Sequence, residues 1–173
     1  MPDASEPVPT GLTHLDAQGR AQMVDVSHKP ATTRVAIAEA TLRLSPEVRD
    51  RLCRGDLPKG EALAVARVAG IQAAKATATL IPLCHPLPLA QVQVQFAPVG
   101  ADRITVRAEV RTTGPTGVEM EALTAASIAA LTLYDMSKAL CRDAVVETVQ
   151  LLHKSGGKSG TFERAPAAPE ASA

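Results

Sequence analysis

Apolar and polar residues alternate along several stretches of the chain, and a period of two is typical of strands with one buried face. The alternation predicts five strands, at 20–26, 34–44, 89–96, 104–110 and 145–152. The segment 98–102 contains Pro98 and Gly100 and lies between two of these strands, so we expect it to be the turn of a hairpin.

Helical patterns separate the strands. Ser45-Pro46-Glu47 combines an N-cap residue, a proline at the first helical position and an acid in the first turn, and predicts a short helix that ends at Gly55. Longer helices are predicted over 59–80 and 118–140. The first is rich in alanine. Gly70 in its middle costs about 1 kcal/mol relative to alanine, which indicates a close backbone contact there.

The order strand, helix, strand, strand, helix, strand predicts an α+β fold of the ferredoxin-like, split-βαβ type. Such a fold has one antiparallel sheet with two long helices on one face. The strand at 20–26 would be an extra N-terminal strand. The Gln-rich face of strand 89–96 would have no helix to cover it, and we expect it to be solvated or used for self-association.

Composition bounds the class of protein. The 173 residues suffice for one domain, and an aromatic content of 2% requires an aliphatic core. The formal net charge of zero and the few aromatic residues argue against a nucleic-acid binder. Three cysteines without a CxxC spacing argue for a reducing compartment and against a disulfide framework or a structural zinc site.

The chain shows no signal peptide and no apolar run near the length of a membrane span, so we expect a cytoplasmic protein that does not contact a membrane. We expect one catalytic domain over 11–163, with a mobile Gly/Lys loop over 155–162. The polar, Pro- and Ala-rich ends at 1–10 and 164–173 are expected to be disordered tails.

The predicted helix 118–140 follows a Gly-Pro turn, opens with Glu119 and Glu121, and closes on Asp135 and Lys138. At about 100° per residue, Asp135 lies about 40° from Glu121 around the axis, and Lys138 joins that side. Such a stripe is often only a solvated face. The small apolar residues elsewhere in the helix, and the tight turn before it, favour a functional face beside a cleft.

Three other positions are candidates. Lys59 either precedes the true start of its helix and is solvated, or joins a helix N-terminus in binding an anion such as a phosphate. His85 is held between Pro82 and Pro86, so structural and functional roles are equally open. Cys84 lacks the neighbours that would make it a nucleophile.

Two polar loops are candidates for an anionic ligand. Loop 27–30, with His28, Lys29 and nearby Arg34, is either a solvated connection or an anion site. The run KSGGKSG at 154–160 is not a P-loop, because GxxxxGK[ST] would require glycine at Leu152 and no helix follows. Its lysines either belong to a mobile tail or close over a phosphate-bearing ligand, and we favour closure.

Together these motifs closely resemble the molybdenum cofactor biosynthesis protein C family, the cyclic pyranopterin monophosphate synthases. The matching runs are MVDVS (23–27), KG (59–60), ARVAGIQAAK (66–75), LIPLCHPL (80–87), TGVEMEALTA (116–125), YDM (134–136), KA (138–139) and KSGGKSG (154–160). The resemblance covers about 12–162. Ser137 stands where many members have cysteine, and Pro115 where a polar residue is common.

The resemblance implies a ferredoxin-like subunit in a homohexamer, a trimer of dimers with the active site at the dimer interface. It implies a lyase whose substrate is the cyclic dihydro-GTP intermediate that a radical enzyme makes from GTP. The products would be cyclic pyranopterin monophosphate and pyrophosphate. The implied catalytic residues are Asp135, Lys138, Lys59 and Lys154. The expected substrate contacts are Leu83, Cys84, His85, Met120, Glu121, Glu119, Lys158 and Arg67.

The residue types suit this chemistry. A lysine whose pKa lies near the working pH can act as an acid or base. Asp135, three residues before Lys138, can set the proton affinity of that lysine. The sequence holds no metal-ligand cluster and requires no cofactor, so lysines, Arg67 and helix N-termini would neutralise the leaving pyrophosphate. A divalent ion carried by the substrate phosphates is compatible with the sequence.

The length of the helix predicts a site shared between subunits. Glu121 and Asp135 are about 21 Å apart along the axis, at about 1.5 Å per residue, which is too far for one nucleotide to bridge. We hypothesise that an isologous dimer joins the glutamate end of one helix to the Asp135–Lys138 end of another. The alternatives are a non-catalytic nucleotide-binding regulator and a single-strand RNA binder, which the missing aromatics disfavour.

Overall fold

The computed structural model describes residues 14–16, 18–158 and 160–165. Five strands form one sheet in the order β2-β3-β1-β4-β5, and every neighbouring pair is antiparallel. The strands are β1 (Thr32–Arg43), β2 (Leu89–Val99), β3 (Arg103–Gly114), β4 (Val145–Ser155) and β5 (Phe162–Glu163). The predicted α+β class and the hairpin formed by β2 and β3 are confirmed.

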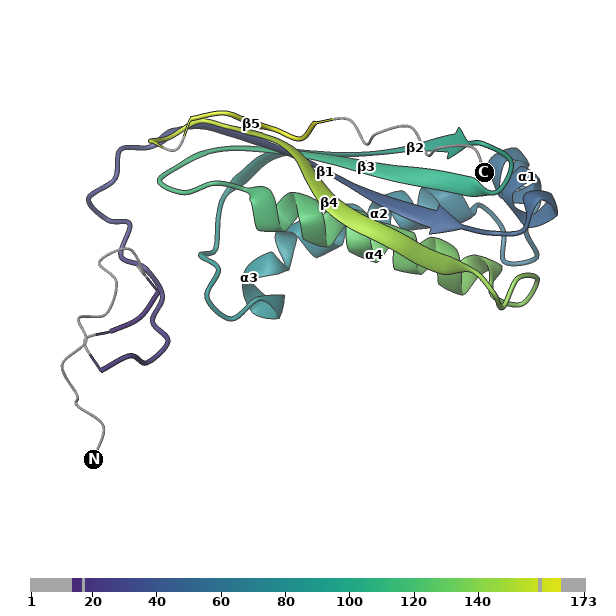
Figure 1. Cartoon of the computed structure of the whole chain (residues 1–173), viewed down its shortest axis with the longest axis horizontal. Helices are drawn as coiled ribbons and strands as arrows, with labels where there is room; N and C mark the ends of the chain where they lie inside the picture. Colours follow the sequence, from purple (N-terminus) through teal and green to yellow (C-terminus); the bar gives the residue numbers. More distant parts are fainter. Residues whose placement is uncertain (1–13, 17, 159, 166–173) are drawn as a thin grey trace.

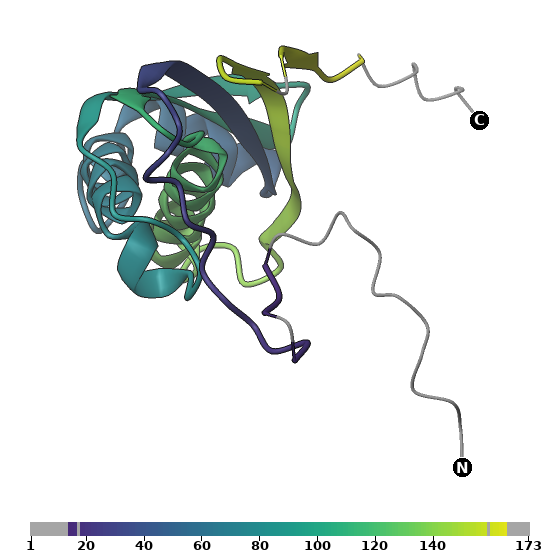
Figure 2. The same cartoon turned by 90° about the vertical axis from the view of Figure 1, so that its left-hand side faces the viewer.

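Four helices complete the described part of the chain: α1 (Pro46–Arg54), α2 (Ala62–Lys75), α3 (Thr77–Leu80) and α4 (Glu119–Ser137). Figures 1 and 2 show α2 and α4 side by side against the same face of the sheet, as predicted. No helix of the described residues is long and apolar enough to cross a membrane.

Small side chains fill the space between sheet and helices. Ala36, Ala38 and Ala40 of β1 are fully buried, and α4 contributes five fully buried alanines, Ala122, Ala125, Ala126, Ala129 and Ala130. The alternation therefore identified the buried face of β1 correctly. Gln93 and Gln95 of β2 are exposed on the opposite face, where no described element covers them.

The caps predicted for the first helix are present. The Ser45 hydroxyl accepts a hydrogen bond from the Val48 amide at 3.4 Å, and Pro46 occupies the first helical position. Gly55 ends α1 in the left-handed region with φ of 72°, and its amide donates to the Leu52 carbonyl at 3.1 Å. These local signals fixed α1 because each one acts within a few residues.

The predicted helix 59–80 is instead two helices, α2 and α3, that meet at Ala76. Ala76 has φ of −96° and ψ of 3°, and the buried Thr77 hydroxyl donates to the Ala73 carbonyl at 3.2 Å. A turn precedes α2 and contains Lys59, so this lysine lies before the helix rather than in its first turn.

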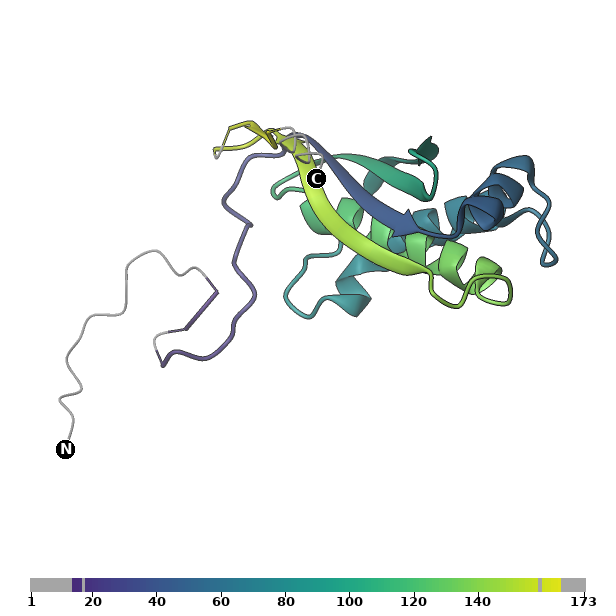
Figure 3. The ribbon, with the colours of Figure 1, turned by 45° about the vertical axis from the view of Figure 1, so that its right-hand side comes forward.

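The expected extra N-terminal strand at 20–26 is wrong. Among the described residues, the isolated bridge between Leu15 and Ala21 is its only strand-like pairing, and the segment leaves the sheet, as Figure 3 shows. The Val24 carbonyl oxygen of this segment lies 2.8 Å from Nε2 of His85. The fifth strand is β5, which pairs with β4. The expected tails lie outside the described residues, apart from Arg164 and Ala165, which carry no helix or strand.

Gly70 marks a close approach of α2 to its neighbours. A β-carbon built on Gly70 would lie 3.0 Å from the Ala125 carbonyl oxygen of α4 and 3.2 Å from the side chains of Ala129 and Val94. The close contact that the sequence indicated is therefore confirmed.

We expect Gly70→Val to lower the free energy of unfolding by about 1–3 kcal/mol, because its branched side chain would force α2 away from α4. Urea denaturation would measure this change. Ala64→Val is the matched control, since Ala64 is exposed on the same helix. An equal loss in the two variants would show that β-branching, and not the helix contact, is responsible.

Candidate functional site

Six predicted substrate contacts gather where α4 begins. They are Leu83, Cys84 and His85 from the loop after α3, and Glu119, Met120 and Glu121 from the first turn of α4. They line a cavity of about 230 Å³, which we call the carboxylate pocket. The structure therefore confirms that these residues lie together.

Burial controls the charge in the carboxylate pocket. Glu121 is only 4% exposed, and this burial, with the nearby negative charge of Glu119, raises its pKa. Burial also raises the pKa of the Cys84 thiol, and the Glu121 carboxylate adds to that rise. A thiol with a raised pKa is a poor nucleophile, in agreement with the expectation for Cys84.

His85 has a structural contact as well as a place in this pocket. Its Nε2 lies 2.8 Å from the Val24 carbonyl oxygen. That contact holds segment 24–26 against the pocket, where Val24 and Val26 form part of the wall. The imidazole therefore positions a pocket wall even before any ligand is considered.

A second cavity of about 590 Å³ adjoins the first, and Lys29, Thr116, Gly117 and Glu119 line both. We call it the lysine-loop pocket, because its cationic wall consists of Lys29, Arg34, Lys154 and Lys158. Lys154 Nζ lies 3.1 Å from a carboxylate oxygen of Glu119. These four cations form a local positive region on a protein whose formal net charge is zero. Such a region suits an anionic ligand.

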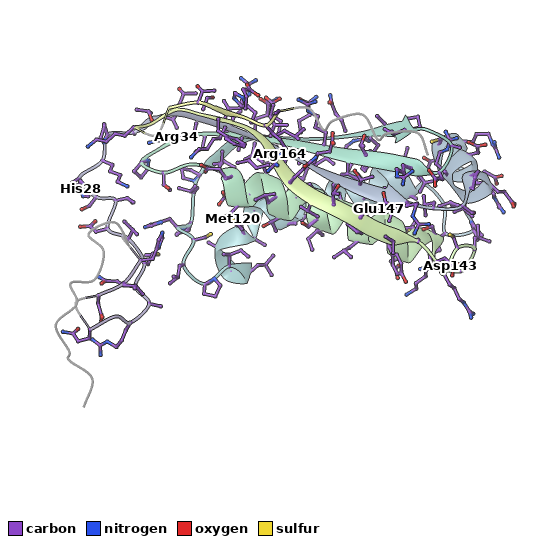
Figure 4. The ribbon with its side chains drawn as sticks, in the orientation of Figure 1. His28, Arg34, Met120, Asp143, Glu147 and Arg164 are labelled. Atoms are coloured by element: carbon purple, nitrogen blue, oxygen red, sulfur yellow. The ribbon has the colours of Figure 1, made fainter. Side chains whose placement is uncertain are left out.

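Lys29 and Arg34 were left between two interpretations by the sequence, and the structure places both in the lysine-loop pocket. His28 is not among the lining residues, although Figure 4 shows it on the segment that leads there. The useful signal was a cluster of cations around the start of β1. No comparable cluster of charges marked Thr116, whose position depends on how the turn before α4 folds.

The other end of α4 holds the remaining predicted catalytic residues. Asp135 Oδ2 lies 2.8 Å from Lys59 Nζ, and Asp135 Oδ1 lies 2.7 Å from Lys138 Nζ. Lys59 also donates to the Asp135 carbonyl at 2.8 Å. We call these three residues the lysine–aspartate cluster.

Hydrogen bonds from Lys138 and Lys59 lower the pKa of Asp135 to about 2. The same carboxylate raises the pKa of Lys138 by hydrogen bonding and by its charge. Asp135 therefore stabilises the protonated form of its neighbour, and the cluster presents ammonium groups that can hold an anion or donate a proton.

The two ends of the charged stripe of α4 differ in burial. Glu121 is buried by the loop that carries Cys84, whereas the Asp135 side chain is 54% exposed. The charges thus form two separate groups at the two ends of one helix. Figure 4 shows Met120 and Arg34 at one end of the molecule and Asp143, beyond the end of α4, at the other.

Arg67 joins neither group. Its Nε donates to the Val94 carbonyl at 3.2 Å, and its guanidinium lies 5.5 Å from the centre of the Phe96 ring. Within the described residues, no three His, Cys, Asp or Glu side chains gather in a way that could hold a metal ion.

Comparison with known proteins shows the family to which the chain belongs. The chain is 56% identical over 156 residues to the cyclic pyranopterin monophosphate synthase of Pelotomaculum thermopropionicum, an alignment that covers 90% of this chain and 92% of that protein. The model of the MoaC family matches residues 23–157, which include the lysine–aspartate cluster and all residues lining the two pockets except His14 and Lys158. The chain belongs to the MoaC family.

Proposed function

We propose that this protein is a cyclic pyranopterin monophosphate synthase of molybdenum cofactor biosynthesis. It converts the cyclic dihydro-GTP intermediate, made from GTP by a radical enzyme, into cyclic pyranopterin monophosphate and releases pyrophosphate. The observation that carries the proposal is the joined pair of pockets, cationic in one part and acidic in the other. Family membership and the name of the relative support it.

The two pockets suit the two parts of such a substrate. The lysine-loop pocket takes the phosphates, since ammonium and guanidinium groups bind phosphate oxygens through charge-assisted hydrogen bonds. The carboxylate pocket takes the guanine-derived ring. Glu121, whose pKa is raised, can offer a ring nitrogen or carbonyl a hydrogen bond from its protonated form, and Glu119 can accept one.

The lysine–aspartate cluster supplies proton transfer and charge neutralisation. Lys138, kept protonated by Asp135, acts as a general acid or holds the departing pyrophosphate, and Lys59 shares the second task. Lys154 contacts the phosphates from the other side. No resident cofactor is needed for these roles, and a divalent ion carried by the substrate phosphates is compatible with them.

A complete site needs two subunits. About 21 Å of helix axis lies between Glu121 and Asp135, so the carboxylate pocket and the lysine–aspartate cluster of one chain cannot hold the same nucleotide. We propose a ferredoxin-like subunit, supported by the strand order β2-β3-β1-β4, in a cytoplasmic homohexamer built as a trimer of dimers. Each active site would combine one subunit's pockets with the partner's lysine–aspartate cluster.

We expect Lys59→Ala and Lys138→Ala each to lower kcat for the cyclic dihydro-GTP intermediate by at least about 100-fold, because both remove a reacting or neutralising cation. Single-turnover assays with purified intermediate would measure this. Lys75→Ala, which removes an exposed lysine from the end of α2, is the control and should keep the wild-type rate. Full activity in both variants, with unchanged binding, would show that neither lysine is catalytic. No turnover by the wild-type protein would support the non-catalytic regulator.

The pH dependence of kcat/KM should report the pairing of Asp135 with Lys138. Asp135→Asn removes the carboxylate that raises the pKa of Lys138, so that pKa falls and the basic limb of the profile moves to lower pH. Asp143→Asn alters an exposed acid beyond the end of α4 and should leave the limb in place. An unmoved limb in Asp135→Asn would mean that Lys138 does not act in its protonated form.

A shared site predicts complementation between inactive chains. Glu121→Gln and Lys138→Ala subunits, unfolded and refolded together, should regain about a quarter of the wild-type activity, because random pairing leaves about one site in four intact. Each variant refolded alone serves as the baseline. If the mixture is no more active than the two baselines, the pockets and the cluster do not meet across an interface.

A further inference from the structure

Arg34, near the start of β1, connects segments that are far apart in the sequence. Its Nε donates to the Gly114 carbonyl at 3.3 Å and its Nη2 donates to the Pro115 carbonyl at 3.2 Å. Both carbonyls belong to the passage from β3 into α4. The guanidinium therefore fixes the backbone that leads directly to Glu119.

The same guanidinium lies against a glycine backbone. Gly156 and Gly157 have φ of 97° and 73°, a region that favours glycine. A β-carbon built on Gly157 would overlap Arg34 Nη1 and lie 2.6 Å from its Cζ, and one built on Gly156 would overlap the Thr33 carbonyl oxygen. Position 157 therefore cannot carry a side chain unless Arg34 moves.

These contacts adjoin two lysines of the lysine-loop pocket. Lys154 pairs with Glu119 at 3.1 Å, just beyond the turn that Arg34 holds, and Lys158 directly follows Gly157. On the far side of the loop, β5 returns to β4, where the Arg164 amide donates to the Leu152 carbonyl at 2.8 Å. The segment 154–158, which we call the lysine loop, begins at Lys154, which pairs with Phe162 of β5. Arg34 lies against the middle of this loop.

We propose that Arg34 is a positioning residue, whose forked guanidinium locks the lysine loop onto the turn that precedes α4, with Gly157 as the surface it rests on. Geometry matters here more than charge. A lysine at position 34 would keep the positive charge but lacks the planar fork that serves two carbonyls at once. The consequence for catalysis, that Lys154 and Lys158 are held ready for phosphates, rests on the proposed function.

Hydrogen exchange tests the lock without any substrate. Mass spectrometry would follow the backbone amides of residues 155–158 in the wild-type protein and in Gly157→Ala, Gly160→Ala and Arg34→Lys. Gly160 has φ of 65°, and a β-carbon there meets nothing within 4 Å. Both alanines therefore introduce similar backbone strain, and only the one at position 157 collides with Arg34.

We expect exchange to become about tenfold faster in Gly157→Ala and Arg34→Lys, and to stay within about twofold of wild type in Gly160→Ala. Adding Gly157→Ala to Arg34→Ala should accelerate exchange no further than Arg34→Ala alone, because both changes break one contact. Thermal unfolding confirms that each variant is folded. Equal exchange in the two alanine variants, wild-type exchange in Arg34→Lys, or unprotected amides in the wild-type protein would each overturn the proposal.

Steady-state kinetics separates this inference from the proposed function. Arg34→Lys and Gly157→Ala should raise KM for the cyclic dihydro-GTP intermediate by about tenfold with little change in kcat, because they disturb phosphate binding and not the reacting cluster. If the variants show the expected exchange pattern but the wild-type protein shows no turnover, only the proposed function is rejected. Normal turnover with equal exchange in Gly157→Ala and Gly160→Ala would reject only the role of Arg34.

Discussion

The close approach of α2 and α4 is the contact on which the rest of the structure depends. With aromatic residues at 2% of the chain, the core is built from small aliphatic side chains. Gly70 allows the two helices to touch at the Ala125 carbonyl. This antiparallel packing places the turn before α2 beside the end of α4, where Lys59 meets Asp135 at 2.8 Å. Core packing and the charged cluster are therefore consequences of one contact.

The rigidity of α4 then divides the chemistry. An α-helix keeps its ends at a fixed distance, so the buried glutamate at one end and the lysine–aspartate cluster at the other cannot converge within one chain. The helix instead presents two half-sites of opposite electrostatic character. At one end, burial raises the pKa of Glu121. At the other end, the exposed Asp135 carboxylate raises the pKa of Lys138 and keeps it charged.

The positive region of the lysine-loop pocket also arises from tertiary contacts. Lys29 and Arg34 come from the segment before and within β1, and Lys154 and Lys158 come from the end of β4 and its loop. Antiparallel pairing of β1 with β4, in which Ala36 stands opposite Lys154, brings these cations to one end of the sheet. Figure 4 shows Arg34 at that end, close to the start of α4.

The sequence by itself determined what short-range patterns encode. Alternation identified the buried face of β1, capping residues bounded α1, and the motifs named the lysines and carboxylates that the structure gathers. Tertiary structure alone decided the rest. Segment 20–26 alternates like a strand, yet it leaves the sheet, and its Val24 carbonyl oxygen contacts the His85 imidazole. Glu121 and Asp135 share a helical stripe, yet only Glu121 is buried. Burial depends on which loop packs against each end of the helix, and the periodicity of the helix does not reveal that loop.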